Sequence, residues 1–332
     1  MTRRGTGGGV TEPRASRALP LGHGLRCVLF HNLTTIDGPF TRGLGVSISP
    51  VAFERRIRFL TRHYDTVDLD AILSRATDAH PRPLLVTFDD AYASVAREAV
   101  PILERYGVPA VFFVNAATVE GEHLPIDNLV CFVANTAGLD AVRSALAAIG
   151  VPHGRALDSV PDAIAHAVSA LTVDELEAFD RALRDRVSVD PLEEAHRAGL
   201  FLTPIELAAL PEAGVEVGNH TYHHVWCRHL DPATAEIEIA HNAEVLEAFT
   251  GRPVRAFSVP YGRRADLTST VVSAVEGSGH LATFLVDARP NRHPTDLGGI
   301  QRVSLHDVSD ARTAVELEVL PRLRRIRDRV RA

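Results

Sequence analysis

The stretch that decides the fold is residues 83–90, which have the sequence PLLVTFDD. Its first six residues form a short apolar run without strict alternation, which is typical of a strand buried on both faces of a parallel sheet. The run ends in two carboxylates, Asp89 and Asp90. Because successive side chains of a strand alternate in direction, these two carboxylates are expected to point apart. Asp is also favoured in turns and at helix N-caps, so the pair alone leaves a structural role open.

Similar apolar runs recur along the chain and alternate with helix-period segments, which predicts parallel βα units and an α/β protein. The expected strands are 26–30, 44–48, 83–88, 109–114, 215–218, 256–259, 282–286 and 301–305. The expected helices are 51–63, 93–106, 203–212, 232–250, 266–278 and 311–330. Helical segments near 138–149, 160–170 and 173–187 interrupt this pattern without a clear strand, so we interpret residues from about 118 to 200 as a helical insertion.

The 332 residues are enough for one large α/β barrel or two modest domains. A net charge of −7 argues against a nucleic-acid partner. All 35 basic residues are arginine, which excludes Schiff-base and P-loop lysine chemistry. Cys27, Cys131 and Cys227 match neither a disulfide framework nor a CxxC motif, so we expect buried free thiols.

The first 24 residues are rich in Gly, Arg and Pro and predict a flexible tail, residues 1–24, before a barrel that spans residues 25–332. No apolar segment follows Arg3-Arg4, so a twin-arginine signal is not expected. No run of 18 apolar residues occurs, so we expect no membrane span. These features favour a cytoplasmic protein, and they leave its oligomeric state open.

Three histidines lie within residues 220–224, which follow an expected strand. His220 and His224 are four residues apart, so both imidazoles can reach one ion. Together with one carboxylate they would form a three-ligand metal site that leaves a position open for water. His223 is the competing ligand. We expect a divalent ion, with zinc first and cobalt, nickel or manganese as alternatives.

Two further segments come after late strands. Pro260-Tyr261-Gly262 forms a turn that can aim a backbone N–H at a developing oxyanion. His306 could act as a general acid, although it could equally be a loop residue beside an Asp that caps the next helix. His31 is a weaker candidate of the same kind. Trp226, the only tryptophan, follows the histidines, and we expect it to contact the substrate together with Pro260 and Tyr261.

These segments together resemble three motifs of the polysaccharide deacetylase family, also called the NodB-homology or carbohydrate esterase family 4 proteins. Thr87-Phe88-Asp89-Asp90 resembles the TFDD motif, residues 220–224 resemble the H-[ST]-x-x-H motif, and Pro260-Tyr261-Gly262 resembles the core of the third motif. The resemblance covers roughly residues 25–117 and 200–325.

The resemblance implies a distorted (β/α) barrel with fewer than eight complete units, here carrying a helical insertion. It also implies roles for individual residues. Asp89 would be the general base, and Asp90, His220 and His224 would bind the metal. The backbone N–H of Tyr261 would help to hold the oxyanion while metal-activated water attacks the amide carbonyl.

The chain departs from the family pattern in three places. Ser258 stands where many members have an arginine that contacts the base, so another group must orient Asp89. The Asp…Trp pattern of the fourth motif is not visible. His306 aligns only loosely with the acid histidine of the fifth motif.

We therefore expect a metal-dependent hydrolase that removes an N-acetyl group from an amino sugar or an amino-sugar-containing intermediate. A cytoplasmic location would favour a soluble substrate. The alternatives are a deacetylase of a cell-wall or exported polysaccharide, a deformylase of a sugar conjugate, and a non-catalytic carbohydrate-binding relative. A metal-independent relative that acts on cyclic amides would need a changed metal triad.

Overall fold

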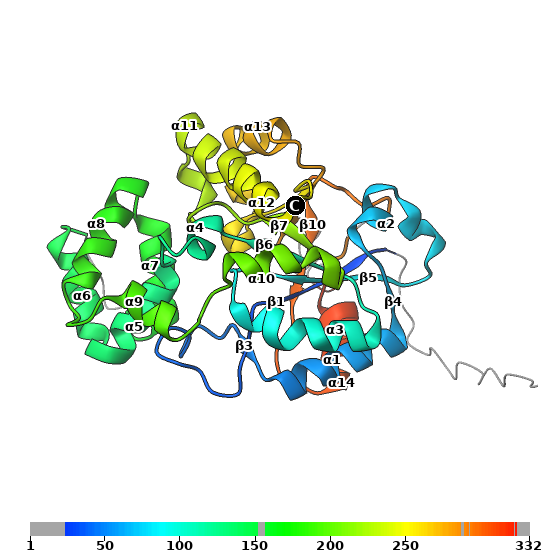
Figure 1. Cartoon of the computed structure of the whole chain (residues 1–332), viewed down its shortest axis with the longest axis horizontal. Coiled ribbons are helices and arrows are strands. Elements are labelled where there is room, and N and C mark those ends of the chain that lie inside the picture. The colour runs from blue at the N-terminus through cyan, green and yellow to red at the C-terminus, as the bar shows by residue number, and fades with distance from the viewer. Residues whose placement is uncertain (1–23, 152–156, 287–288, 292, 322, 324–332) are drawn as a thin grey trace, which may run out of the picture.

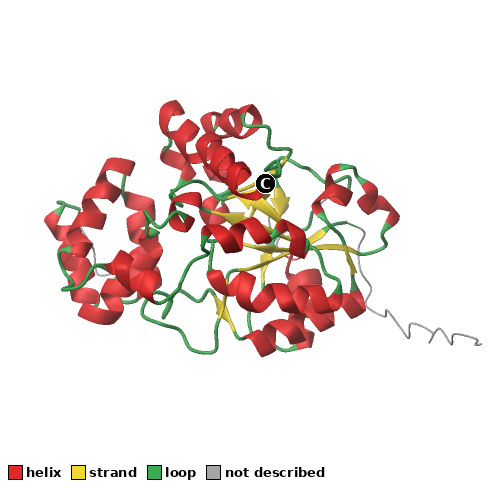
Figure 2. Ribbon diagram, viewed as in Figure 1, coloured by secondary structure: helices red, strands yellow, loops and turns green. Residues whose placement is uncertain are grey.

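The computed structural model describes residues 24–151, 157–286, 289–291, 293–321 and 323. The expected tail lies outside the described residues except for Gly24, and so does the end of the last expected helix. Helices surround a central sheet on its outer side, and a second group of helices stands beside the barrel (Figures 1 and 2). Among the described residues, no helix combines the length and apolar character that crossing a membrane requires.

The central sheet has nine parallel strands, which follow the order β10-β9-β8-β7-β6-β5-β1-β11, with β4 added beside β5. The strands are β1 (Arg26–Phe30), β4 (Asp65–Thr66), β5 (Pro83–Phe88), β6 (Ala110–Val114), β7 (Val215–Asn219), β8 (Ala256–Ser258), β9 (Ala282–Leu285), β10 (Ile300–Gln301) and β11 (Val303–Ser304). Because β10 pairs with β9 while β11 pairs with β1, the segment 300–304 nearly closes the sheet into a barrel. The expected distorted barrel is confirmed.

The expected strand 301–305 is divided at Arg302 into β10 and β11, and other parts of the strand prediction were wrong. The expected strand 44–48 shortens to β3 (Ser47–Ile48), which pairs with β2 (Asn32–Leu33) in a separate small sheet. Gly43 and Gly45 have φ values of +97° and +73°, a backbone conformation that cannot continue an extended strand. The two-residue strands β2 and β4 were missed because Asn-Leu and Asp-Thr give no apolar run.

Most expected helices are present with shifted ends. The helices around the barrel are α1 (Pro50–His63), α2 (Leu69–Leu73), α3 (Val100–Tyr106), α4 (Ala116–Val119), α10 (Pro204–Ala209), α11 (Pro232–Ala235), α12 (Asn242–Thr250), α13 (Ser269–Gly277) and α14 (Asp310–Ala314). The short helices α2 and α4 were not predicted. A π-helical turn joins α11 to α12, so residues 232–250 form the expected continuous helix. Asp231 caps it by accepting hydrogen bonds from the N–H groups of Ala233 and Thr234.

Between α4 and α10 the described residues form a helical lobe, which we call the insertion. Its helices are α5 (Ile126–Ala137), α6 (Leu139–Ala148), α7 (Val160–Ala170), α8 (Val173–Arg184) and α9 (Pro191–Arg197). The sequence prediction missed α5 and α9. Helix α5 carries apolar residues around most of its circumference, so no single apolar stripe marked it. The insertion has its own apolar core, which reaches the barrel through Tyr92, Phe201 and Trp226.

The alternation of strand side chains decides what faces the barrel interior. On β5, Val86 and Phe88 pack outward with the helices, whereas Leu85 packs inward. Thr87 and Asp89 have the parity of Leu85, so both point into the barrel. The three cysteines are buried and free, as expected.

Candidate active site

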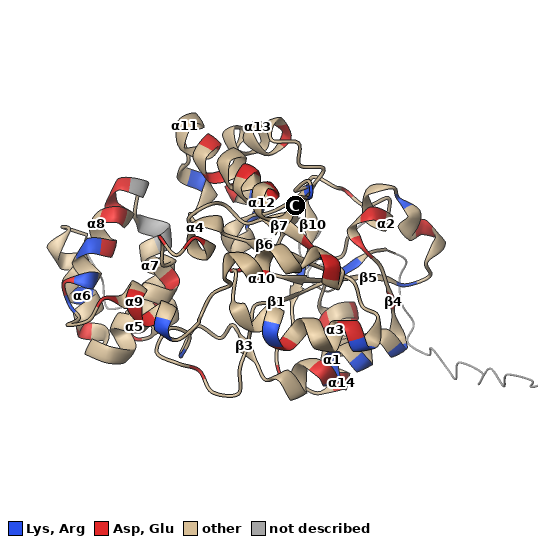
Figure 3. Cartoon of the chain, in the orientation of Figure 1, with Lys and Arg blue, Asp and Glu red and all other residues tan. Residues whose placement is uncertain are grey.

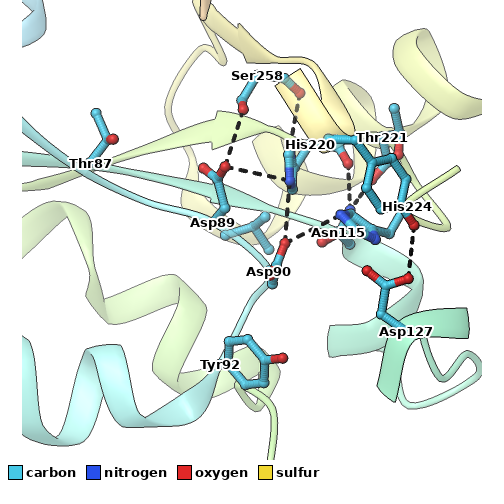
Figure 4. A network of polar contacts seen from close by, with 12 residues as sticks. Thr87, Asp89, Asp90, Tyr92, Asn115, Asp127, His220, Thr221, His224 and Ser258 are labelled. Atoms are coloured by element: carbon cyan, nitrogen blue, oxygen red, sulfur yellow. Dashed lines mark hydrogen bonds and ion pairs between the residues drawn. The ribbon is translucent and has the colours of Figure 1, made fainter. Parts of the chain in front are cut away.

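Asp89 and Asp90 leave β5 in different directions, as the alternation rule predicts. The Asp89 N–H donates to the Phe30 carbonyl at 3.2 Å, which keeps this residue in register with β1. Asp90 then has a φ of +75°, so the chain turns and carries its carboxylate toward the histidines. Figure 4 shows Asp89 beneath Ser258 and Asp90 facing His220 and His224.

Left-handed backbone conformations concentrate at this end of the barrel. Among the described residues, six that are not glycine have a positive φ. Five of them lie at the site: Asp90, Ala91, Thr221, His224 and Tyr261. Such conformations cost about 1–3 kcal/mol each and persist only where the surroundings impose them. The orientation of these side chains is therefore maintained at a cost in folding free energy.

Asp90, His220 and His224 bring one potential ligand atom each to within 4.8 Å of one another. The His220 Nε2 lies 3.3 Å from Asp90 Oδ1, and the His224 Nε2 lies 3.4 Å from the same oxygen. Two imidazole nitrogens and one carboxylate oxygen form a donor set that suits zinc and similar divalent ions. The residues therefore fit a catalytic-type metal site.

The orientation of His220 supports that interpretation. Its Nδ1 lies 2.8 Å from the Ser258 carbonyl oxygen, to which it can donate, so the lone pair of Nε2 is available to a metal ion. The buried Asn115 amide donates to the carbonyls of His220 and Thr221, the latter at 3.0 Å. The Thr221 N–H donates at 2.9 Å to Asn219 Oδ1. Sequence reasoning missed these buried asparagines.

His223 points elsewhere. Its Nδ1 lies 2.7 Å from Glu238 Oε1, and its backbone N–H donates to Glu238 Oε2 at 2.9 Å. His223, the competing metal ligand considered from the sequence, is therefore paired with Glu238 instead.

Arg302 is the group that orients Asp89 in place of the arginine that Ser258 replaces. Its guanidinium donates to both oxygens of Asp89 at 2.7 Å each, and to the Ser258 hydroxyl at 2.6 Å. Arg302 interrupts the closing segment between β10 and β11 and is fully buried inside the barrel. A charged residue at an inward position of an apolar strand must find a buried partner. An arginine within an apolar strand segment is therefore the sequence signal for such a buried ion pair.

The same ion pair controls the protonation of the candidate base. Burial by itself raises the pKa of Asp89, but the charge of Arg302, aided by His220, outweighs it and holds the pKa below its usual value. Burial likewise raises the pKa of Asp90, and the neighbouring His224 and His220 reverse the shift. Both carboxylates are therefore ionised at neutral pH.

Tyr261 lies across the mouth of the barrel. Its ring centroid is 5.0 Å from that of His224, and its hydroxyl donates to Asp127 Oδ1 at 3.0 Å. Gly262 is needed beside it, because a Cβ there would come within 2.4 Å of the Val286 nitrogen. Pro260 is buried in the same turn. Asp127 comes from α5 of the insertion, and burial together with the charge of Asp90 raises its pKa to about 7. Sequence reasoning missed Asp127.

Trp226 lines a cavity of about 540 Å³ that also touches His224 and Tyr261. The side chains of Arg228 and Arg263 lie over its ring, with their guanidinium carbons 4.8 and 5.9 Å from the centroid. Its indole nitrogen has no hydrogen-bond partner in the described part of the chain. The predicted contact residues Pro260, Tyr261 and Trp226 therefore lie close to the candidate ligands.

His306 is less closely connected. It is exposed, and within the described residues its side chain makes no hydrogen bond or ion pair with Asp89, Asp90 or the two candidate histidine ligands. His31, on the neighbouring strand end, is close enough for its charge to lower the pKa of both carboxylates. The acid role of His306 stays a prediction.

Comparisons with known proteins agree with the geometry. A model of the family described as polysaccharide deacetylase matches residues 76–277. A Streptococcus pyogenes deacetylase, PplD, solved in complex with acetate, has a TM-score of 0.57 at 13% identity, with 89% of this chain and 98% of that chain covered. IcaB from Ammonifex degensii has a TM-score of 0.56 at 19% identity, with 90% and 98% covered.

A polysaccharide deacetylase from Bacillus cereus, BC0361, has a TM-score of 0.53 at 17% identity, with 89% of this chain and 69% of that chain covered. At these identities the likeness to solved structures concerns the fold alone. No curated protein matches the sequence. Because the family model spans more than half of the chain and includes both metal-type motifs, the chain belongs to the polysaccharide deacetylase family.

Proposed function

We propose that this protein is a metal-dependent hydrolase that removes the N-acetyl group from an amino sugar or an amino-sugar-containing intermediate. The observation that carries the proposal is that the two neighbouring carboxylates, Asp89 and Asp90, have different partners. Asp90 lies 3.3–3.4 Å from the two histidines, whereas Asp89 is held apart by Arg302. A separate, ionised base beside a three-donor site is the arrangement that hydrolysis of an amide needs.

A divalent cation held by Asp90, His220 and His224 would polarise the acyl carbonyl and make a nearby water more acidic. Asp89 accepts the proton of the attacking water, because its carboxylate is ionised and lies next to His220, with Oδ2 3.7 Å from Nε2. The Tyr261 backbone N–H would donate to the developing oxyanion. The carbon–nitrogen bond then breaks, a general acid protonates the amine, and acetate leaves.

The decisive experiment is a screen for acetate release from N-acetylated sugars, both small and polymeric. The purified protein is first stripped with a chelator and then supplied separately with zinc, cobalt, nickel or manganese. N-formylated analogues belong in the same screen, because the same chemistry would remove a formyl group. We expect one metal ion per chain and activity that returns when the metal is added back.

The matched control uses the histidine loop itself. We expect His224→Ala to lose metal and turnover, whereas His223→Ala, whose side chain pairs with Glu238, should keep both. Activity that survives the chelator, with no metal found by elemental analysis, would refute the metal mechanism. The cytoplasmic location expected from the sequence stays a prediction, which cell fractionation tests.

A further inference from the structure

A second, smaller cavity lies between the insertion and the mouth of the barrel. It has a volume of about 220 Å³ and touches the candidate ligands Asp90 and His224. Tyr261 forms part of its wall, and so does Asp127 from α5. The cavity is therefore adjacent to the reacting centre, and the insertion supplies one side of it.

The lining of this cavity combines apolar and polar groups. The apolar lining residues include Leu44, Val46 and Ile164, which belong to the loop before β3 and to α7. The polar lining residues include Asp127 and Arg263. A sugar ring has a matching character, because its C–H groups form apolar faces while its hydroxyl groups lie around the rim. A lining that combines apolar side chains with a hydrogen-bond acceptor thus suits a pyranose ring.

One oxygen of the Asp127 carboxylate is available to accept a hydrogen bond from a ligand. Its Oδ1 accepts the hydrogen bond of the Tyr261 hydroxyl at 3.0 Å. Its Oδ2 accepts no hydrogen bond from the described part of the chain, and the side chain is only half-buried. Figure 4 shows Asp127 on the insertion helix, facing the site from the side opposite to β5. Tyr261 thus fixes the carboxylate and leaves the second oxygen for a ligand.

The volume limits what can enter. An apolar cavity of roughly 150 Å³ holds a benzene ring. A cavity of about 220 Å³ therefore has room for one six-membered ring with substituents, but not for two linked rings. The larger cavity beside Trp226 shares His224 and Tyr261 with it and could receive the remainder of a substrate.

We propose that the small cavity binds one terminal N-acetylated amino-sugar ring, and that Asp127 is a positioning residue that accepts a hydrogen bond from a ring hydroxyl. This inference rests on the proposed function and names its substrate class: single amino sugars and chain ends, not the interior units of a polymer. The insertion, which contributes Asp127, makes that selection.

The first test measures binding without turnover. In the zinc-loaded Asp89→Asn protein at about pH 8.5, above the pKa of about 7 of Asp127, titration with N-acetylglucosamine should show that Asp127→Ala raises the Kd about tenfold to a hundredfold, the loss expected for a hydrogen bond to a charged acceptor. Asp140→Ala is the matched control, because this exposed carboxylate of α6 pairs with Arg143 away from the cavity. It should leave the Kd unchanged.

The second test separates positioning from a structural role. In the otherwise wild-type enzyme, Asp127→Ala should raise KM for N-acetylglucosamine while kcat/KM for an aryl acetate without hydroxyl groups stays the same. A structural defect would lower kcat/KM for both substrates. Asp127→Glu should recover part of the loss with N-acetylglucosamine. With tetra-N-acetylchitotetraose, mass spectrometry should find at most one acetyl group removed from each chain.

The outcomes distinguish the two proposals. If no N-acetylated sugar releases acetate but Asp127→Ala still weakens sugar binding, the hydrolytic function fails and the cavity assignment stands. The cavity assignment is overturned if N-acetylglucosamine does not bind, if Asp127→Ala leaves both Kd and KM unchanged, or if interior acetyl groups of the tetramer are removed.

Discussion

The barrel and the insertion hold their polar side chains in contrasting ways. Inside the barrel, Asp89 is 3% exposed and both of its oxygens are bonded to Arg302. In the insertion, Asp127 is half-buried and held through one oxygen only. Acidic and basic residues both occur along the helices of the barrel and of the insertion (Figure 3). The barrel thus contains rigid, preorganised groups suited to chemistry, whereas the insertion presents an accessible group suited to recognition.

The largest expected effect comes from the base. Asp89→Asn should lower kcat by about 10²- to 10⁴-fold, because the amide cannot accept the proton of the attacking water. Metal content should be unchanged, since Asp90 and the two histidines remain. Isothermal titration with zinc and initial-rate kinetics check both statements. Turnover retained within threefold would show that another group is the base.

The second effect concerns the group that holds the base. Arg302→Met should destabilise the fold by about 3–5 kcal/mol, because it leaves a buried carboxylate without its partner. Turnover should fall by about a hundredfold, the cost of a misplaced reacting group. Urea unfolding and kinetics measure these losses, and the double variant Ser258→Arg/Arg302→Met should recover part of the activity. A single variant with normal kinetics would limit Arg302 to a structural role.

The pH dependence of Arg302→Met has a definite sign. In the wild type the pKa of Asp89 is held below its usual value, so the ion pair stabilises the fold above about pH 4 and is lost as the pH falls further. Without Arg302, burial dominates and the pKa of Asp89 rises. The acidic limb of kcat/KM should therefore move to higher pH, and an unmoved limb would contradict this explanation.

A smaller effect is expected at the barrel rim. If His306 is the general acid, His306→Ala should lower kcat about a hundredfold without loss of metal, and the basic limb of the pH profile should change. His31→Ala is the matched control on the neighbouring strand end. Unchanged kinetics for His306→Ala, with a rate loss for His31→Ala, would move the acid role to His31.

The smallest expected effect tests the insertion. Ala165 lies on α7 and lines the small cavity, so Ala165→Phe should fill part of it and raise KM for N-acetylglucosamine several-fold. Metal affinity and the free energy of unfolding should not change. Ala148→Phe, an exposed position on α6, controls for the added side chain. Equal KM values for the two variants would argue that substrate does not enter this cavity.

Much of the barrel follows from local pattern. Apolar runs predicted most strands of the central sheet, because burial on both faces requires it at nearly every position. The prediction failed where the sequence has no such pattern. Strand β4 is only two residues long, so it forms no apolar run, and α5 is apolar around most of its surface, so it has no single apolar stripe. The strand expected at 44–48 failed because two glycines turn the chain.

The sequence by itself determined the barrel class, the pair of carboxylates and the two histidines four residues apart. Each of these features depends on residues that are close together in the sequence. Only the tertiary structure decided what holds and surrounds them. Arg302 lies 213 residues from Asp89, and they meet because closing the barrel carries Arg302 inward. Tyr261 and Asp127 are 134 residues apart and meet because the insertion packs against the barrel mouth. Such partners depend on distant segments packing together, which short-range periodicity cannot specify.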